Sequence, residues 1–111
     1  MPSSYKLEFP VGVPTQVLFD ALAKTPAIGT LKAELSQPEQ GRMLFINPST
    51  WAKRGQNVLV LFRTEGPSKT VVVVHSSCIS GLQVFDGGQN QKNCEMVRDH
   101  ILSLAKKIAV E

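Results

Sequence analysis

The stretch QNVLVLFRTEGPSKTVVVVHSS, residues 56–77, decides the fold. In its first part (56–65), valine and phenylalanine alternate with leucine at the period of a β-strand. Its last part (69–77) is the most β-branched run in the chain, and Gly-Pro-Ser between the two parts is a turn sequence. The stretch therefore predicts an antiparallel hairpin. Because both faces of these strands are apolar, either the strands are central and partly covered on the second face, or that face is a binding or dimerisation surface.

Three shorter strands are expected on the N-terminal side of this hairpin. YKLEF (5–9) and TLKAELSQ (30–37) alternate apolar with polar residues, and GRMLFIN (41–47) is short and apolar. Pro10 and the glycine and proline that follow are expected to end the first strand. PEQG (38–41) is expected to form a turn, because proline starts turns and glycine tolerates a left-handed conformation. The segment from residue 79 to 85 is ambiguous and could add a short edge strand.

Two segments have helical spacing. PTQVLFDALAKT (14–25) has apolar residues on one side, a proline at its start and Pro26 after its end. A second amphipathic pattern runs from about residue 93 to 110. Residues 1–4 are expected to be a flexible tail, and residues 5–111 a single domain.

The predicted order of elements is β-α-β-β-β-β-α. This order predicts a two-layer α+β domain, in which an antiparallel sheet packs against a long C-terminal helix. Each helix has one apolar stripe, so both are expected to cover the same face of the sheet. The opposite face is expected to be wetter and to carry polar residues from several strands, among them Lys32, Glu34, Arg63 and His75.

Composition narrows the classes of function. The 111 residues are 42% hydrophobic and 19% charged, which is typical of one globular domain. The net charge of +3 is spread along the chain, so nucleic-acid binding is not expected. Neither a membrane-spanning run nor a secretory signal is found, and we expect a cytoplasmic location. In that compartment Cys78 and Cys94 are expected to be reduced thiols, and no metal or cofactor signature is present.

The segment DGGQNQKN (86–93) is a candidate binding loop with two interpretations. In the first, backbone N–H groups of Gly87, Gly88 and Asn90, with Lys92 beside them, hold an anion at the start of the last helix. In the second, one glycine takes a positive φ to turn the chain, and one of the two asparagines caps the helix. The chain lacks the spacing of a P-loop or of a dinucleotide-binding loop.

Three further side chains are candidates for a site. Trp51 opens the long strand and is either an anchor for a partner or a cover for the core. His75 is either a base that shares a pocket with Asp86 or a partly buried, hydrogen-bonded residue. Cys94 would lie in the first turn of the last helix, where a thiolate is favoured, and is either a nucleophile or a small core residue. No base is expected within its reach.

The order of elements resembles the TATA-binding-protein-like fold and a shortened helix-grip domain of the START/polyketide-cyclase type. As in those domains, FPVGVPTQVLFDAL (9–22) runs from the first strand into a helix. Three local features resemble a group of small bacterial domains of unknown function: Ser-Thr-Trp (49–51) with Gly55 before a strand, His-Ser-Ser (75–77) at a strand end, and the loop 86–93. The resemblance covers most of the chain. It implies a fold and no activity.

The leading functional interpretation is a non-enzymatic interaction or binding module that associates with a protein partner, or with itself as a homodimer, through the open sheet. The alternative, which the START-like resemblance suggests, is a small apolar ligand bound between the sheet and the C-terminal helix. A third interpretation is a small enzyme that uses Cys94 or His75. The cavity of the ligand-binding alternative is expected to be lined by Val58, Val60, Val73, Ile101 and Leu104.

Overall fold

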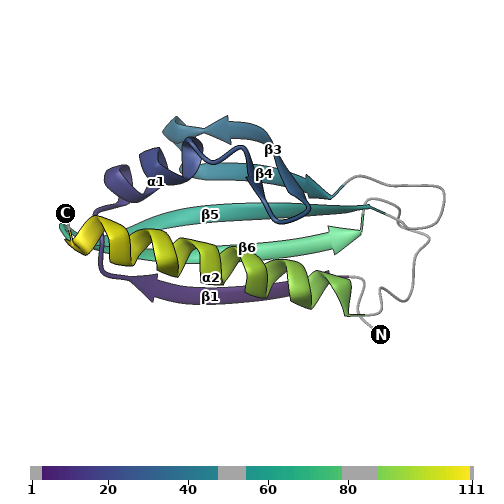
Figure 1. Ribbon diagram of the computed structural model, residues 1–111. Coiled ribbons are helices and arrows are strands. Elements are labelled where there is room, and N and C mark those ends of the chain that lie inside the picture. The colour runs from purple at the N-terminus through teal and green to yellow at the C-terminus, as the bar shows by residue number, and fades with distance from the viewer. Residues whose placement is uncertain (1–3, 48–54, 79–87, 111) are drawn as a thin grey trace.

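The computed structural model describes residues 4–47, 55–78 and 88–110 (Figure 1). Within these ranges, six strands form one antiparallel sheet in the order β1-β6-β5-β4-β3-β2, and the sheet curls around the long helix α2. The elements are β1 (Ser4–Val11), α1 (Thr15–Ala23), β2 (Ala27–Ile28), β3 (Leu31–Gln37), the 3₁₀ turn η1 (Pro38–Gln40), β4 (Arg42–Asn47), β5 (Gln56–Gly66), β6 (Lys69–Cys78) and α2 (Gln89–Val110). The predicted α+β order is confirmed, with the two-residue strand β2 as an addition.

The predicted hairpin is the centre of the sheet. Strand β6 pairs with β5 on one side and with β1 on the other, so its β-branched residues lie between two neighbours. Val60 lies opposite Val74, and Leu61 lies opposite Val73. Since side chains alternate along a strand, this register places Val60 and Val74 on one face and Leu61 and Val73 on the other.

The face that meets the helices, here called the inner face, carries the core. Val58, Val60 and Val74 are fully buried there. From α2, Val97 and Ile101 pack into the same hydrophobic cluster and are also fully buried. Each such side chain contributes roughly 1.5–3 kcal/mol when it leaves water. Both α1 and α2 lie on this face, as their apolar stripes predict (Figure 1).

The opposite, outer face carries both polar residues and the apolar residues of the central strands that the sequence places there. Arg63 and Lys32 are exposed there, but Leu59, Leu61 and Val73 of the central strands are also on it and are half-buried. The prediction that Val73 lines a cavity together with Val58 and Val60 is wrong, because the register turns Val73 to the outer face.

Two predicted boundaries differ from the structure. Strand β1 continues through Pro10 to Val11 instead of ending at the proline. Strand β1 is an edge strand, so the missing N–H of Pro10 is tolerated there. Helix α2 begins at Gln89, four residues before the expected start. Its first turn is too polar to show an apolar stripe.

The turns follow the predicted chemistry. Gly41 follows η1 with a φ of 61°, and its carbonyl accepts from the Phe62 N–H at 2.8 Å. Gly88 precedes α2 with a φ of 81°, and its carbonyl accepts from the Lys92 N–H at 3.0 Å. Both glycines adopt a left-handed conformation that a residue with a Cβ avoids. The segment 79–85, in which an edge strand was considered, lies outside the described residues.

Candidate functional site

A groove of about 160 Å³ lies on the inner face, between the C-terminal end of α1 and strands β3 and β4. Leu22, Met43 and Phe45 form its floor, and each is at most 3% exposed. Leu22 comes from α1, whereas Met43 and Phe45 come from β4. The groove therefore gives access to core side chains from the edge of the domain.

The groove exists because neither of the two described helices covers the inner face of β3. Every residue from Lys32 to Ser36 is exposed, although β3 pairs with β4 along its length. In the register of this pair, Ala33 lies opposite Phe45, and Ser36 lies opposite Met43. Small side chains thus lie beside large ones on the same face, and the space that a larger residue on β3 would fill is left open.

A β-bulge shapes the rim of the groove. The register shifts between Ala33 and Leu35, so Glu34 is an extra residue in β3. Bulges redirect side chains and are common beside binding sites. The groove is lined by Glu34, by Ser36 and by Thr25, whose hydroxyl lies 3.5 Å from the carbonyl oxygen of Ala21. An apolar floor with a few polar groups is the usual character of a small-molecule site.

A second group of interest is a buried polar cluster beneath the start of α2. Ser76 on β6 donates to Oδ1 of Asn90 at 2.7 Å, and Nδ2 of Asn93 donates to the Ser76 hydroxyl at 3.2 Å. Asn93 also donates to Oε1 of Gln56 at 3.3 Å, and that oxygen accepts from Asn47 at 2.8 Å. Ser76 and both helix asparagines are 0% exposed. Since these groups bond one another, the cluster fixes the start of α2 onto β5 and β6.

The sequence-predicted site residues are dispersed. Gly88 turns the chain, Asn90 is buried in the polar cluster, and Lys92 is exposed in the first turn of α2. His75 lies on the outer face opposite Lys6 and Leu59, on the other side of the sheet from α2. His75 is therefore on the opposite face of β6 from Ser76, the neighbour that bonds Asn90.

Other sequence-predicted residues fall outside the described ranges or differ in role. Gly87, Trp51 and Asp86 lie outside the described residues. The prediction that one of the two asparagines caps the helix is wrong, because α2 begins at Gln89. Asn90 is the second residue of the helix, and Asn93 lies in its second turn. Its amide is part of the polar cluster.

Cys94 is a core residue. It lies in the second turn of α2, is 0% exposed, and its Sγ lies 3.4 Å from the carbonyl oxygen of Tyr5 and 3.6 Å from that of Val74. Burial raises the pKa of its thiol to about 11, with a smaller contribution from the negative charge of Glu95. The thiol is therefore protonated at neutral pH, which removes the basis for a thiolate nucleophile.

His100 is a partly buried histidine on α2. Burial lowers its pKa, and the positive charge of Lys107 lowers it further. Its Nε2 atom is buried and has no hydrogen-bond partner among the described residues. The neutral ring is the favoured form at physiological pH.

Neither a metal site nor a membrane span is found in the described part of the chain. Nowhere in residues 4–47, 55–78 and 88–110 do three or more His, Cys, Asp or Glu side chains gather closely enough to hold a metal ion. Over the same ranges, no helix combines the length and the apolar character that crossing a membrane requires.

The groove residues were not predicted from the sequence. Leu22, Met43 and Phe45 have the pattern of ordinary core residues, and each is at most 3% exposed, so the sequence does not distinguish them from the rest of the core. The one local signal was the pair of small residues in β3, Ala33 and Ser36, which face β4. Their common face is hidden in the sequence, because the bulge at Glu34 breaks the two-residue alternation.

Comparison with known proteins identifies the fold. No protein-family model and no curated protein matches the sequence. Among solved structures, a START superfamily protein from Mycobacterium smegmatis superposes with a TM-score of 0.69 at 7% identity, over 95% of this chain and 98% of that one. The Zhui aromatase/cyclase from Streptomyces sp. R1128 superposes with a TM-score of 0.54 at 13% identity, over 96% of this chain and 90% of that one.

A third similar structure is larger. The di-domain ARO/CYC StfQ from the steffimycin biosynthetic pathway superposes with a TM-score of 0.63 at 14% identity. The match covers 95% of this chain and 46% of that chain, so this chain spans about half of the larger protein. These identities show a shared fold alone. The chain has the START-type helix-grip fold that its order of elements predicted.

Proposed function

We propose that this protein binds a small apolar molecule, about the size of a single ring, in the groove between α1, β3 and β4. The observation that carries the proposal is the floor of the groove, where Leu22, Met43 and Phe45 meet an opening in the surface. A ligand seated there would bury its own apolar surface against this floor, which is the main favourable term in binding molecules of this kind.

The size of the groove limits the ligand. Its volume of about 160 Å³ is similar to that of an engineered protein cavity of roughly 150 Å³ that binds benzene. One ring or a short branched chain therefore fills it, and a molecule of several fused rings would extend out of the groove. Two of the similar structures are aromatase/cyclases, and this supports a ligand that contains a ring.

The position of the groove differs from the cavity expected between the sheet and the C-terminal helix. Val58, Val60 and Ile101 are fully buried members of the hydrophobic core, and none of them lines the groove. The proposed ligand site therefore lies beside α1 and the β3 edge of the sheet, and not between the central strands and α2.

The rim favours a ligand with one hydrogen-bond donor. The carboxylate of Glu34 accepts hydrogen bonds, and the hydroxyls of Ser36 and Thr25 can accept or donate. A phenolic ring satisfies both parts of the site, because its body is apolar and its hydroxyl can reach the polar rim.

An NMR titration with p-cresol tests this proposal, since p-cresol is a single ring with one methyl and one hydroxyl group. We expect the backbone amide signals of Ala33, Ser36 and Phe45 to shift together, with a Kd on the order of 1 mM for so small a ligand. Unmoved groove signals up to about 5 mM p-cresol, or shifts confined to the outer face, would overturn the proposal.

A further inference from the structure

The outer face of the sheet is an apolar surface opposite the two helices. Both α1 and α2 lie on the inner face, so neither covers it (Figure 1). Leu35 is 49% exposed. Leu59 and Leu61 remain partly exposed although they belong to a central strand. We call this surface the outer apolar face. It consists of Leu35, Leu44, Ile46, Leu59, Leu61 and Val73.

Charged residues flank the outer apolar face in its cross-strand rows. One cross-strand row runs Glu8, Val73, Leu61 and Arg42, from the edge strand β1 to β4. An acid on β1 and a base on β4 therefore flank two apolar residues, and Gln37 on β3 continues the row beyond Arg42. The next row begins with Lys6 and continues through His75, Leu59, Leu44 and Leu35.

The first row is complementary to itself. A two-fold axis that runs along the strands, between β5 and β6, brings β1 of one copy over β4 of the other. It places Glu8 opposite Arg42 of the second copy, and Val73 opposite Leu61 of the second copy. Opposite charges meet on both sides of the contact and apolar side chains meet in the middle, as a symmetric contact between two sheets requires.

We infer that this protein forms a two-fold symmetric homodimer through the outer apolar face, with the Glu8–Arg42 pair made twice across the interface. This inference is independent of the ligand proposed above, which lies on the inner face.

A small groove supports the same arrangement. About 150 Å³ of open space lies on the β3–β4 side of the outer face, and its lining residues include Leu35, Leu44, Leu59 and Arg42. The two-fold axis brings β1 of the second copy to this place. The aliphatic part of Lys6 from the second copy would lie on the leucines, and the Glu8 carboxylate would reach Arg42.

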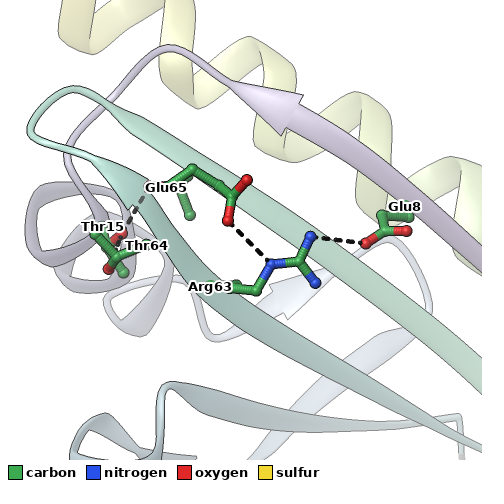
Figure 2. Close-up of polar contacts among 6 residues, drawn as sticks. Glu8, Thr15, Arg63, Thr64 and Glu65 are labelled. Carbon is green, nitrogen blue, oxygen red and sulfur yellow. Dashed lines mark hydrogen bonds and ion pairs between the residues drawn. The ribbon is translucent and has the colours of Figure 1, made fainter.

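The charged groups are already held on the surface before any association. The Arg63 guanidinium lies between Glu8 and Glu65, with N···O distances of 3.2 and 3.3 Å (Figure 2). The side chains of Glu8 and Arg63 are 50% and 57% exposed. Arg42 donates to Oε1 of Gln37, its neighbour on β3. These contacts orient the charges and leave them accessible.

Charge reversal measured by sedimentation tests the dimer. We expect the unmodified protein to sediment as a concentration-dependent monomer–dimer mixture. Glu8→Arg and Arg42→Glu should each weaken the dimer about tenfold or more, because each places like charges together at two symmetric positions. The double variant Glu8→Arg/Arg42→Glu restores opposite charges and should recover a dimer Kd within about threefold of the original.

Two further variants complete the test. Lys106→Glu makes the same change in charge as Arg42→Glu on an exposed position of α2, and should leave the dimer unchanged. Leu61→Lys should give a monomer, because it places a charge at the centre of the apolar contact. A monomer for the unmodified protein at every concentration overturns the inference. So does a dimer that neither single charge reversal weakens, or a double variant that stays as weak as the single ones.

Discussion

The amide nitrogen of Asn93 lies 3.2 Å from the hydroxyl oxygen of Ser76, and both side chains are fully buried. This contact joins the second turn of α2 to β6, and it extends to Gln56 on β5. Polar groups in such a place must bond one another, since a buried group without a partner costs about 1–3 kcal/mol. The start of α2 is therefore fixed by a polar cluster rather than by the apolar stripe that packs the rest of the helix.

Replacing Asn93 should be costly. Asn93→Ala removes one of the two hydrogen bonds of the Ser76 hydroxyl, which still donates to Asn90. It also removes the acceptor of Gln89, whose Nε2 donates to Asn93 Oδ1 at 2.8 Å. We expect the free energy of unfolding to fall by about 2–3 kcal/mol in urea denaturation. Gln91→Ala is the matched control, because Gln91 is exposed on the same helix and bonds Glu95 at its surface. Equal losses for the two variants would show that the cluster adds no stability.

The two cysteines should differ in reactivity. With Cys78→Ser as background, Cys94 is the single thiol, and it should react with a disulfide reagent at pH 8 only when the protein unfolds. Burial that raises the pKa of Cys94 to about 11 leaves almost no thiolate in the folded state. In the reverse variant, Cys94→Ala, the half-buried Cys78 should react faster. Rapid labelling of folded Cys94 would contradict the core role assigned to it.

Stability should depend on the protonation of His100. Burial and Lys107 lower its pKa in the folded state, so the unfolded chain binds a proton more readily. The free energy of unfolding should therefore fall as the pH drops from above 6.5 toward the folded-state pKa, and this contribution levels off below that pKa. His100→Gln should show a smaller decrease between pH 7.5 and pH 5.5 in urea denaturation. Parallel pH profiles for the two proteins would rule His100 out as the cause.

The parts of the fold that could be predicted rest on local patterns. The alternation in residues 56–65 and the β-branched run after it determine both faces of β5 and β6. The helical spacing of Val97 and Ile101 determines the buried side of α2. Such patterns are local because burial repeats at the period of the element itself.

The parts that could not be predicted depend on contacts between distant segments. The groove requires that α1 be short, that β3 have a bulge at Glu34, and that Ala33 come to lie opposite Phe45. The length of α1 is predicted by Pro26, whereas the bulge and the position of Ala33 follow from the pairing of β3 with β4, which the sequence pattern does not determine. For the same reason Asn93 resembled a helix cap in the sequence, whereas its partners Ser76 and Gln56 lie far away along the chain.

Blocking the groove tests the central proposal most directly. Ala33→Phe places a large side chain into the groove from an exposed strand position, where a phenylalanine is compatible with a strand. Lys32→Phe is the matched control, because it adds the same side chain one residue earlier, on the opposite face. Circular dichroism should show both variants folded before any binding is measured.

In calorimetric or NMR titrations with p-cresol, we predict that the unmodified protein and Lys32→Phe bind with a similar Kd on the order of 1 mM, and that Ala33→Phe shows no binding. Unchanged binding by folded Ala33→Phe would contradict the assignment of the ligand to the groove between α1, β3 and β4.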